Sequence, residues 1–115
     1  TLSMGVSNNG SFGDTVYVAT GSLTAYRWHY VAFQRSGSTL SAYLDGTRSN
    51  TATKGGNIYF NDADELRIGY WRGADPMYLA NGTMIEQLRF TNGVARYSGT
   101  TIDIPDSPFP TSPSA

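Results

Sequence analysis

The amino-acid sequence predicts an all-β domain built as a two-sheet antiparallel sandwich. Apolar and polar residues alternate over several short segments, turn-forming residues separate these segments, and no stretch of ten or more residues has helical periodicity. The chain has one Lys and two Glu among 115 residues, together with 13 Gly and eight Tyr. Because Lys and Glu usually cover exposed helix faces, this composition favours strands and turns.

The strongest predicted element is a hairpin in the first half of the chain. Residues 28–35 are rich in aromatic and β-branched residues, residues 36–39 form a short loop containing Gly37, and residues 40–44 alternate. Strand, short loop and strand is the pattern of a β-hairpin. The alternation predicts one buried and one partly wet face, with Leu40, Ala42 and Leu44 on the first and Ser41 and Tyr43 on the second. Asp45 and Gly46 then predict a tight turn.

Further strands are predicted wherever the alternation recurs between turn signals. They cover residues 2–6, 15–19, 58–60, 66–70, 77–79 and 84–90. Beyond residue 104 the chain carries four prolines among Ser and Thr. Because proline cannot donate to a ladder, this tail is expected to leave the sheet as a surface strap or a linker. The predicted organisation is a sandwich domain over residues 1–104 and an extended Pro/Ser-rich tail over residues 105–115.

Composition and charge argue against several classes of function. The net charge is −1 and the seven Arg residues are scattered, whereas a nucleic-acid partner requires a concentrated basic patch. The chain contains no Cys, which excludes disulfides and thiolate metal sites. No apolar run reaches the ~18 residues of a membrane-spanning helix. We therefore expect neither nucleic-acid binding nor membrane insertion.

Five segments, taken in order, resemble laminin G-like domains, which have the concanavalin A-like jelly-roll fold. The hairpin carries WHYVA at 28–32, RSGSTL at 35–40 and YLDG at 43–46, similar to the central hairpin of those domains. ELRIG at 65–69 resembles their following strand, and NGTMIEQLRF at 81–90 resembles a late one. The ending, TNGVARY at 91–97 with Pro105 and SPFP at 107–110, is similar to modules of tailed-phage virion and tail proteins.

This resemblance implies a non-catalytic module of a virion surface or tail, with a structural role or weak, multivalent adhesion to host-surface glycans. The implied partners are other virion or surface-protein subunits in a multicopy assembly. The implied location is the virion or, alternatively, the extracellular space. A carbohydrate-binding module of a secreted bacterial protein is the alternative function, and a glycoside hydrolase is a third.

The resemblance also carries expectations about the fold. Trp28, which opens the hairpin, is expected in the core. Laminin G-like domains usually have further N-terminal strands, and this sequence is expected to begin partway through such a domain. Either the chain is a fragment, or another chain completes the open edge of the sheet.

Residues suited to catalysis are sparse, and we predict that the chain is not an enzyme. His29 is the only histidine and is expected in the middle of a strand with a structural role. The serines include no Gly-x-Ser-x-Gly elbow. Glycoside hydrolysis requires two carboxylates flanking the sugar. The Glu-x-Asp-x-x-Glu strand of hydrolytic relatives is absent, since Glu65 and Glu86 are 21 positions apart.

The candidate binding site is an aromatic segment in the second half of the chain. Sugar rings stack on Trp and Tyr because one face of a sugar is apolar, while its hydroxyls need polar neighbours. Residues of both kinds occur in or beside one predicted loop: Tyr70, Trp71, Arg72, Asp75 and Tyr78. The other interpretation is that Trp71 packs at the sandwich edge or in a subunit interface.

Calcium is the metal that laminin G-like domains usually bind, through oxygen ligands. Asn61, Asp62 and Asp64 have suitable chemistry. The resemblance does not support them residue by residue as a family site, however, and acidic residues are common in solvated turns. We therefore predict no metal and no other cofactor, with calcium as the alternative.

Overall fold

The computed structural model describes residues 1–61, 68–71 and 77–110, excluding the side chains of Trp71 and Met77. Contacts within the chain define two compact units. The main unit comprises Thr1–Phe60 and Phe90–Ser107, and the small unit comprises Asn61–Arg89 and Pro108–Ala115.

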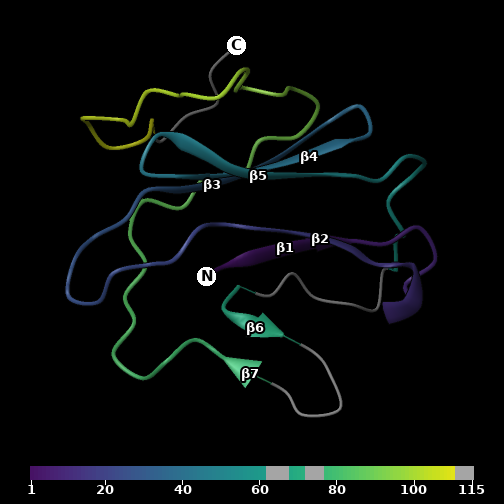
Figure 1. Ribbon diagram of the computed structural model, residues 1–115, viewed down its shortest axis with the longest axis horizontal. Coiled ribbons are helices and arrows are strands. Elements are labelled where there is room, and N and C mark those ends of the chain that lie inside the picture. The colour runs from purple at the N-terminus through teal and green to yellow at the C-terminus, as the bar shows by residue number, and fades with distance from the viewer. Residues whose placement is uncertain (62–67, 72–76, 111–115) are drawn as a thin grey trace. The chain divides into compact units, whose positions relative to one another are not determined.

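Two antiparallel sheets form the main unit (Figure 1). The first sheet pairs β1 (Ser3–Val6) with β2 (Val16–Ala19), and the short 3₁₀ helix η1 (Phe12–Asp14) lies between them in the chain. The second sheet has the order β3–β4–β5, with bounds Val31–Ser36, Thr39–Leu44 and Thr47–Thr53. The predicted all-β fold with antiparallel sheets is confirmed.

Two tight turns set the register of the three-stranded sheet. Ser36 lies opposite Thr39, so a two-residue loop joins β3 to β4, and its Gly37 has φ 59°. Asp45 and Gly46, with φ 49° and 86°, join β4 to β5. Two successive positive φ angles define a type I′ turn, whose twist matches that of the flanking strands. The turn predicted at Asp45 and Gly46 is confirmed.

The two sheets face each other across an apolar core. Its buried members come from both sheets: Val6, Val18, Leu40 and Ala42. Partly buried residues pack around them: Met4, Val16, Phe33 and Ala52. Complete burial of a Val or Leu side chain contributes about 1.5–3 kcal/mol to stability. This core confirms the buried face predicted for residues 40 and 42.

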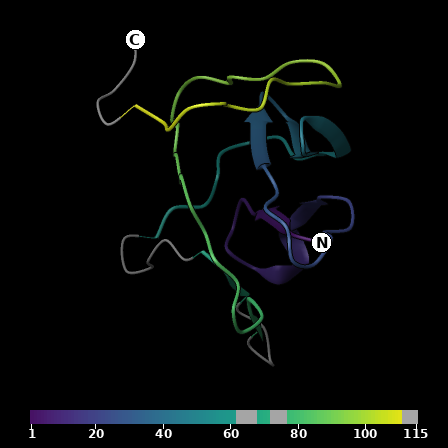
Figure 2. The same ribbon diagram turned by 90° about the vertical axis from the view of Figure 1, so that its left-hand side faces the viewer.

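The other face of β4 was predicted to be partly wet, and that prediction is wrong. Ser41 is 6% exposed and Tyr43 only 1% exposed. Residues 97–102, which we call the C-terminal strap, cover this face on the side opposite β1 and β2 (Figures 1 and 2). The Tyr43 hydroxyl donates to the Gly99 carbonyl at 3.2 Å, and the Tyr43 and Tyr97 rings are 5.7 Å apart between centroids. A segment more than fifty residues away therefore buries the second face.

Polar groups fix the strap to the sheet. The Gln34 side chain on β3 donates from Nε2 to the Tyr97 carbonyl at 2.8 Å and accepts the Tyr97 N–H at Oε1 at 2.7 Å. The Tyr30 and Tyr97 hydroxyls are 2.6 Å apart. Along β5, Thr47 and Thr101 form an isolated antiparallel bridge. The Gln34 side chain thus satisfies both backbone groups of Tyr97, and the bridge pairs part of the β5 edge with the strap.

Strand β5 has no counterpart among the predicted strands. Its sequence, TRSNTAT, contains one apolar residue, Ala52. It therefore lacks the alternation of apolar and polar residues that predicts a strand. The strand forms because the turn at Asp45 and Gly46 returns the chain alongside β4. Pairing with a neighbour, and not the pattern of its own side chains, determines this element.

Other predictions fail where a strand was expected. The first hairpin strand begins at Val31 rather than residue 28, so His29 precedes the strand, and Trp28 is 58% exposed instead of lying in the core. Residues 58–60 and 84–90 form no strand. In both segments the apolar side chains are exposed to solvent, and neither segment has a partner strand among the described residues.

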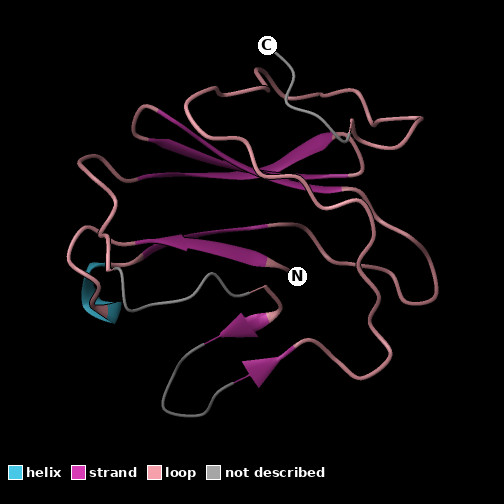
Figure 3. Cartoon of the chain, turned by 180° about the vertical axis from the view of Figure 1, so that it is seen from behind, coloured by secondary structure: helices cyan, strands magenta, loops and turns pink. Residues whose placement is uncertain are grey.

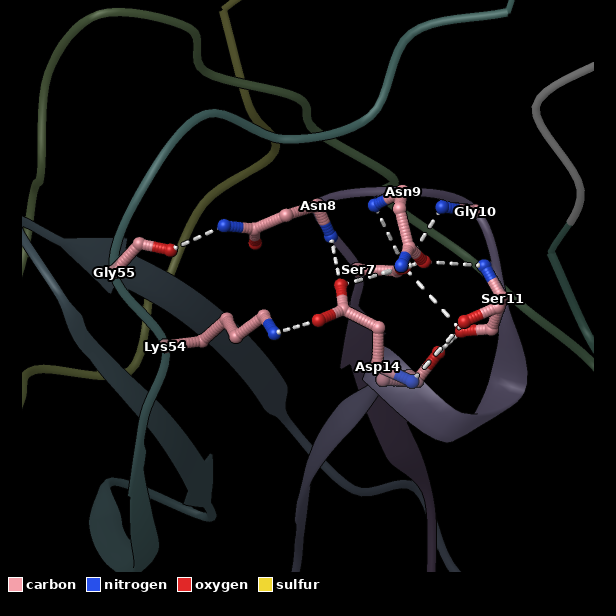
Figure 4. Close-up of polar contacts among 9 residues, drawn as sticks. Ser7, Asn8, Asn9, Gly10, Ser11, Asp14, Lys54 and Gly55 are labelled. Atoms are coloured by element: carbon pink, nitrogen blue, oxygen red, sulfur yellow. Dashed lines mark hydrogen bonds and ion pairs between the residues drawn. The ribbon is translucent and has the colours of Figure 1, made fainter.

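A polar cluster fixes the β1–β2 connection to the end of β5 (Figure 4). Asp14 accepts hydrogen bonds from the Ser7 hydroxyl and the Asn8 N–H, and its other oxygen lies 2.7 Å from Lys54 Nζ. The Asn8 side chain also donates to the Gly55 carbonyl at 2.8 Å. The hydrogen bond from Lys54, followed by that from Asn8, lowers the pKa of Asp14 to about 2.

The small unit contains one two-stranded hairpin, formed by β6 (Tyr70–Trp71) and β7 (Met77–Tyr78) (Figure 3). Residues 66 and 67 of the strand predicted at residues 66–70 lie outside the described residues, and among residues 68–70 only Tyr70 is in a strand. The strand predicted at residues 77–79 is present over two residues.

Candidate functional site

The β6–β7 hairpin brings together two of the five predicted site residues. Tyr70 and Tyr78 are direct cross-strand partners, so their side chains share one face of the hairpin. Their ring centroids are 5.2 Å apart and the ring planes are inclined by 51°. This tilted geometry is a favourable one for an aromatic pair. Residues separated by seven intervening positions thus form one aromatic surface.

Gly69 and Leu79 close the open end of this hairpin. The Leu79 N–H donates to the Gly69 carbonyl at 2.9 Å. Gly69 has φ 74°, and a Cβ atom there would lie 2.8 Å from Leu79 Cδ1. Any larger residue would be strained in that backbone conformation and would displace Leu79. Gly69 therefore allows the chain to approach Leu79 closely at this end of the hairpin.

The aromatic pair is accessible to a ligand. Tyr78 is 72% exposed, and Tyr70 is half-buried. An exposed phenol ring offers an apolar face, and its hydroxyl exchanges hydrogen bonds at the rim. Such a pair can stack against the C–H face of a sugar or pack against an apolar surface of another protein.

The remaining predicted site residues are placed only in part. Trp71 follows Tyr70 in β6, and its backbone pairs with Met77. Arg72 and Asp75 lie outside the described residues. The five-residue site therefore remains a prediction. Of its members, the structure describes the side chains of Tyr70 and Tyr78.

The predicted absence of a metal site is likewise left open. Asn61 is described, but Asp62 and Asp64 lie outside the described residues. Among the residues that are described, no group of three or more His, Asp or Glu side chains is arranged to hold a metal ion. In the same part of the chain, no helix is long and apolar enough to cross a membrane.

The β4–β5 turn carries a second polar cluster that sequence reasoning did not identify. Asp45 Oδ2 lies 2.7 Å from His29 Nδ1 and 3.4 Å from Arg27, and Asp45 Oδ1 accepts the Tyr30 N–H at 2.9 Å. Burial alone would raise the pKa of Asp45, but the hydrogen bonds from His29 and Tyr30 outweigh it and lower that pKa. No sequence signal reveals this cluster, because its members are 15 to 18 positions apart.

Comparison with known protein families identifies the class of this fold. The family model Laminin_G_3, described as the concanavalin A-like lectin/glucanases superfamily, matches residues 1–96. The chain therefore belongs to this family, as the sequence resemblance to laminin G-like domains predicts. Membership is compatible with a carbohydrate-binding or a structural role. Comparisons with curated proteins and with solved structures found no significant match.

Proposed function

We propose that this chain is a non-catalytic adhesion and structural module of a virion surface or tail, which binds host-surface glycans weakly through Tyr70 and Tyr78. The observation that carries the proposal is the tilted, exposed aromatic pair on the β6–β7 hairpin. Membership in a superfamily of lectins and glucanases supports a sugar as the ligand. Trp71, Arg72 and Asp75 belong to the proposed site because they are adjacent in sequence.

Weak binding at one hairpin becomes effective when many copies act together. Two stacked rings bury little apolar area, which limits the affinity of one copy. When several copies are displayed on one particle, binding of the first copy holds the others close to the glycan surface. Their binding is then effectively intramolecular, which raises the avidity. Partners in such an assembly are other virion or surface-protein subunits. The two-stranded β1–β2 sheet supports this, because β1 and β2 have no further strand partner among the described residues.

The placement on a virion rests on the sequence ending at residues 91–110, which is similar to phage virion and tail modules. A non-catalytic role is supported by His29, whose two ring nitrogens lie within hydrogen-bonding distance of Asp45 and Thr24. The net charge of −1 supports the proposed absence of a nucleic-acid partner.

The first test is glycan binding by the full chain displayed in many copies on a bead or particle. Binding to a glycan array is expected, and Tyr78→Ala should weaken it about tenfold, since loss of one ring contact is worth about 1.5 kcal/mol. Phe60→Ala is the matched control, because it removes an exposed ring outside the hairpin. Equal binding by wild type and Tyr78→Ala would contradict the assignment of the site.

Two further measurements test the remaining parts of the proposal. Oligosaccharides that bind should be recovered intact after prolonged incubation, and release of new reducing ends would contradict the non-catalytic role. Mass spectrometry of purified virions should find peptides of this chain. Their recovery in one polypeptide with a secreted hydrolase would instead favour the alternative, a carbohydrate-binding module of a secreted bacterial protein.

A further inference from the structure

The loop between β2 and β3 presents a second set of aromatic side chains. We call residues 23–28 the aromatic loop; it extends beyond the ends of the strands of the main unit (Figures 1 and 3). Tyr26 is fully exposed, and Trp28 is more than half exposed. Exposed aromatic side chains of this kind are suited to contact with a ligand or another protein.

Tyr26 has a backbone conformation that a tyrosine rarely adopts. Its φ angle is 61°, in the left-handed region where glycine is favoured. Unfavourable backbone conformations of this kind persist where the surrounding structure imposes them, and they cluster at ligand-binding positions. Nothing is gained in packing by this arrangement, because the ring is fully exposed. The conformation holds the Tyr26 ring out in solvent.

Hydrogen bonds and an ion pair hold the aromatic loop in place. His29 Nε2 lies 3.0 Å from both the N and the O atom of Thr24, which fixes the start of the loop. His29 Nδ1 and Arg27 both contact the Asp45 carboxylate, which fixes its end to the β4–β5 turn. The Asp45 N–H in turn donates to the Tyr30 carbonyl at 2.8 Å. A loop fixed before binding loses less conformational entropy when a ligand arrives.

The chemistry of the loop favours a neutral sugar. Aromatic rings stack on the apolar face of a pyranose, whose hydroxyls need hydrogen-bond partners close by. The Arg27 side chain is 57% exposed, so its guanidinium presents N–H groups to solvent, and it lies between Tyr26 and Trp28 in the sequence. Its charge is balanced by Asp45, 3.4 Å away. A balanced guanidinium can donate to hydroxyls but attracts a carboxylate only weakly.

We infer that the aromatic loop is a second sugar-binding site, in which Tyr26 and Trp28 stack on a neutral pyranose and Arg27 donates to its hydroxyls. The inference rests on the proposed function insofar as the ligand is a glycan, but it concerns residues of the main unit only. Together with the site proposed at the β6–β7 hairpin, the aromatic loop would give each copy of the chain two sugar-binding sites.

The two tryptophans of the chain allow the two sites to be tested separately. Trp28 lies in the aromatic loop and Trp71 in β6, and the chain has no other tryptophan. The full chain is labelled with ¹⁵N, and its two indole N–H signals are assigned with Trp28→Phe and Trp71→Phe. Neutral tri- and tetrasaccharides of glucose, galactose, mannose and N-acetylglucosamine are then titrated, with a uronic-acid trisaccharide for comparison.

The expected result is a saturable shift of the Trp28 signal with a neutral oligosaccharide and a weaker response to the uronic-acid probe. A shift of the Trp71 signal alone would overturn the second site and support the site proposed at the hairpin. A shift of the Trp28 signal alone would support the second site and overturn the hairpin. A Trp28 signal that responds only to protein concentration would overturn the sugar assignment in favour of self-association.

Substitution of Tyr26 by Gly separates a binding role from a structural one. Glycine adopts φ 61° without strain, so Tyr26→Gly is expected to keep or raise the Tm. The same variant should weaken binding at the loop about tenfold, because one stacking ring is lost. Phe60→Ala, which removes another exposed ring, should leave binding unchanged. Unchanged sugar affinity of Tyr26→Gly would overturn the inference.

Discussion

Two segments of this chain have nearly the same pattern and different structures. Residues 40–44 and residues 84–90 both alternate and both predict a strand. The first is β4, whose Leu40 is completely buried between two layers. The second forms no strand, and its Leu88 is 59% exposed. The contrast shows that alternation defines which side chains could share a face, while a strand also needs a neighbour for its backbone groups.

The neighbours of β4 explain the difference. β3 and β5 are joined to it by two-residue turns, so the pairing is local and the turn residues set its register. The C-terminal strap then covers the second face. The segment at residues 84–90 follows a turn at Asn81 and Gly82, but none of the described strands pairs with it.

The largest expected difference is in amide hydrogen exchange. The amides of residues 41–43 should exchange at least about 10³-fold more slowly than those of residues 85–89, because core strands open only with global unfolding. Exchange followed by NMR on the full chain checks this. Similar protection in both segments would show that residues 84–90 are paired in solution.

Removal of a core side chain should have the next largest effect. Leu40→Ala is expected to lower the free energy of unfolding by about 2–5 kcal/mol, since a buried leucine leaves a cavity. Leu88→Ala, the matched control on the exposed segment, should change it by less than about 0.5 kcal/mol. Chemical denaturation measures both. A large loss for Leu88→Ala would mean that this side chain is buried in solution.

A smaller effect is expected for the contact between Gln34 and the strap. Gln34→Ala removes two hydrogen bonds to the Tyr97 backbone and should cost about 1–2 kcal/mol. In the small unit, Gln87 accepts one hydrogen bond, from the Phe109 N–H at 3.0 Å, and is exposed. Gln87→Ala should therefore cost less than about 0.5 kcal/mol. Equal costs would contradict the role of Gln34 in holding the strap.

The smallest effect concerns pH and the Asp14 cluster. The pKa of Asp14 is lowered from 3.8 to about 2 on folding. A depressed carboxyl pKa stabilises the fold above the unfolded value, and that stabilisation is lost as the pH falls from about 4 to about 2. The Tm of the wild type should therefore fall further over this range than that of Asp14→Asn. An equal fall in Tm for the two proteins between these pH values would contradict a stabilising contribution from Asp14.

Much of the fold could be predicted from the sequence, because local signals determine it. The strands of the first sheet, the hairpin turn at Gly37 and the turn at Asp45 and Gly46 were all predicted. Residue type and position predict Tyr70 and Tyr78 as sugar-contacting residues, and the structure places them side by side. β5 could not be predicted, since its polar sequence has no periodicity of its own.

The sequence by itself determined the fold class, the family and the aromatic residues that could contact a sugar, because alternation, turn chemistry and residue type are local properties. Only the tertiary structure decided that Tyr43 is buried, that Trp28 is exposed, and that His29 and Asp45 support the aromatic loop. Each of these depends on contacts between residues distant in the chain. Burial and hydrogen bonding arise when such residues meet, so no pattern along the chain records them.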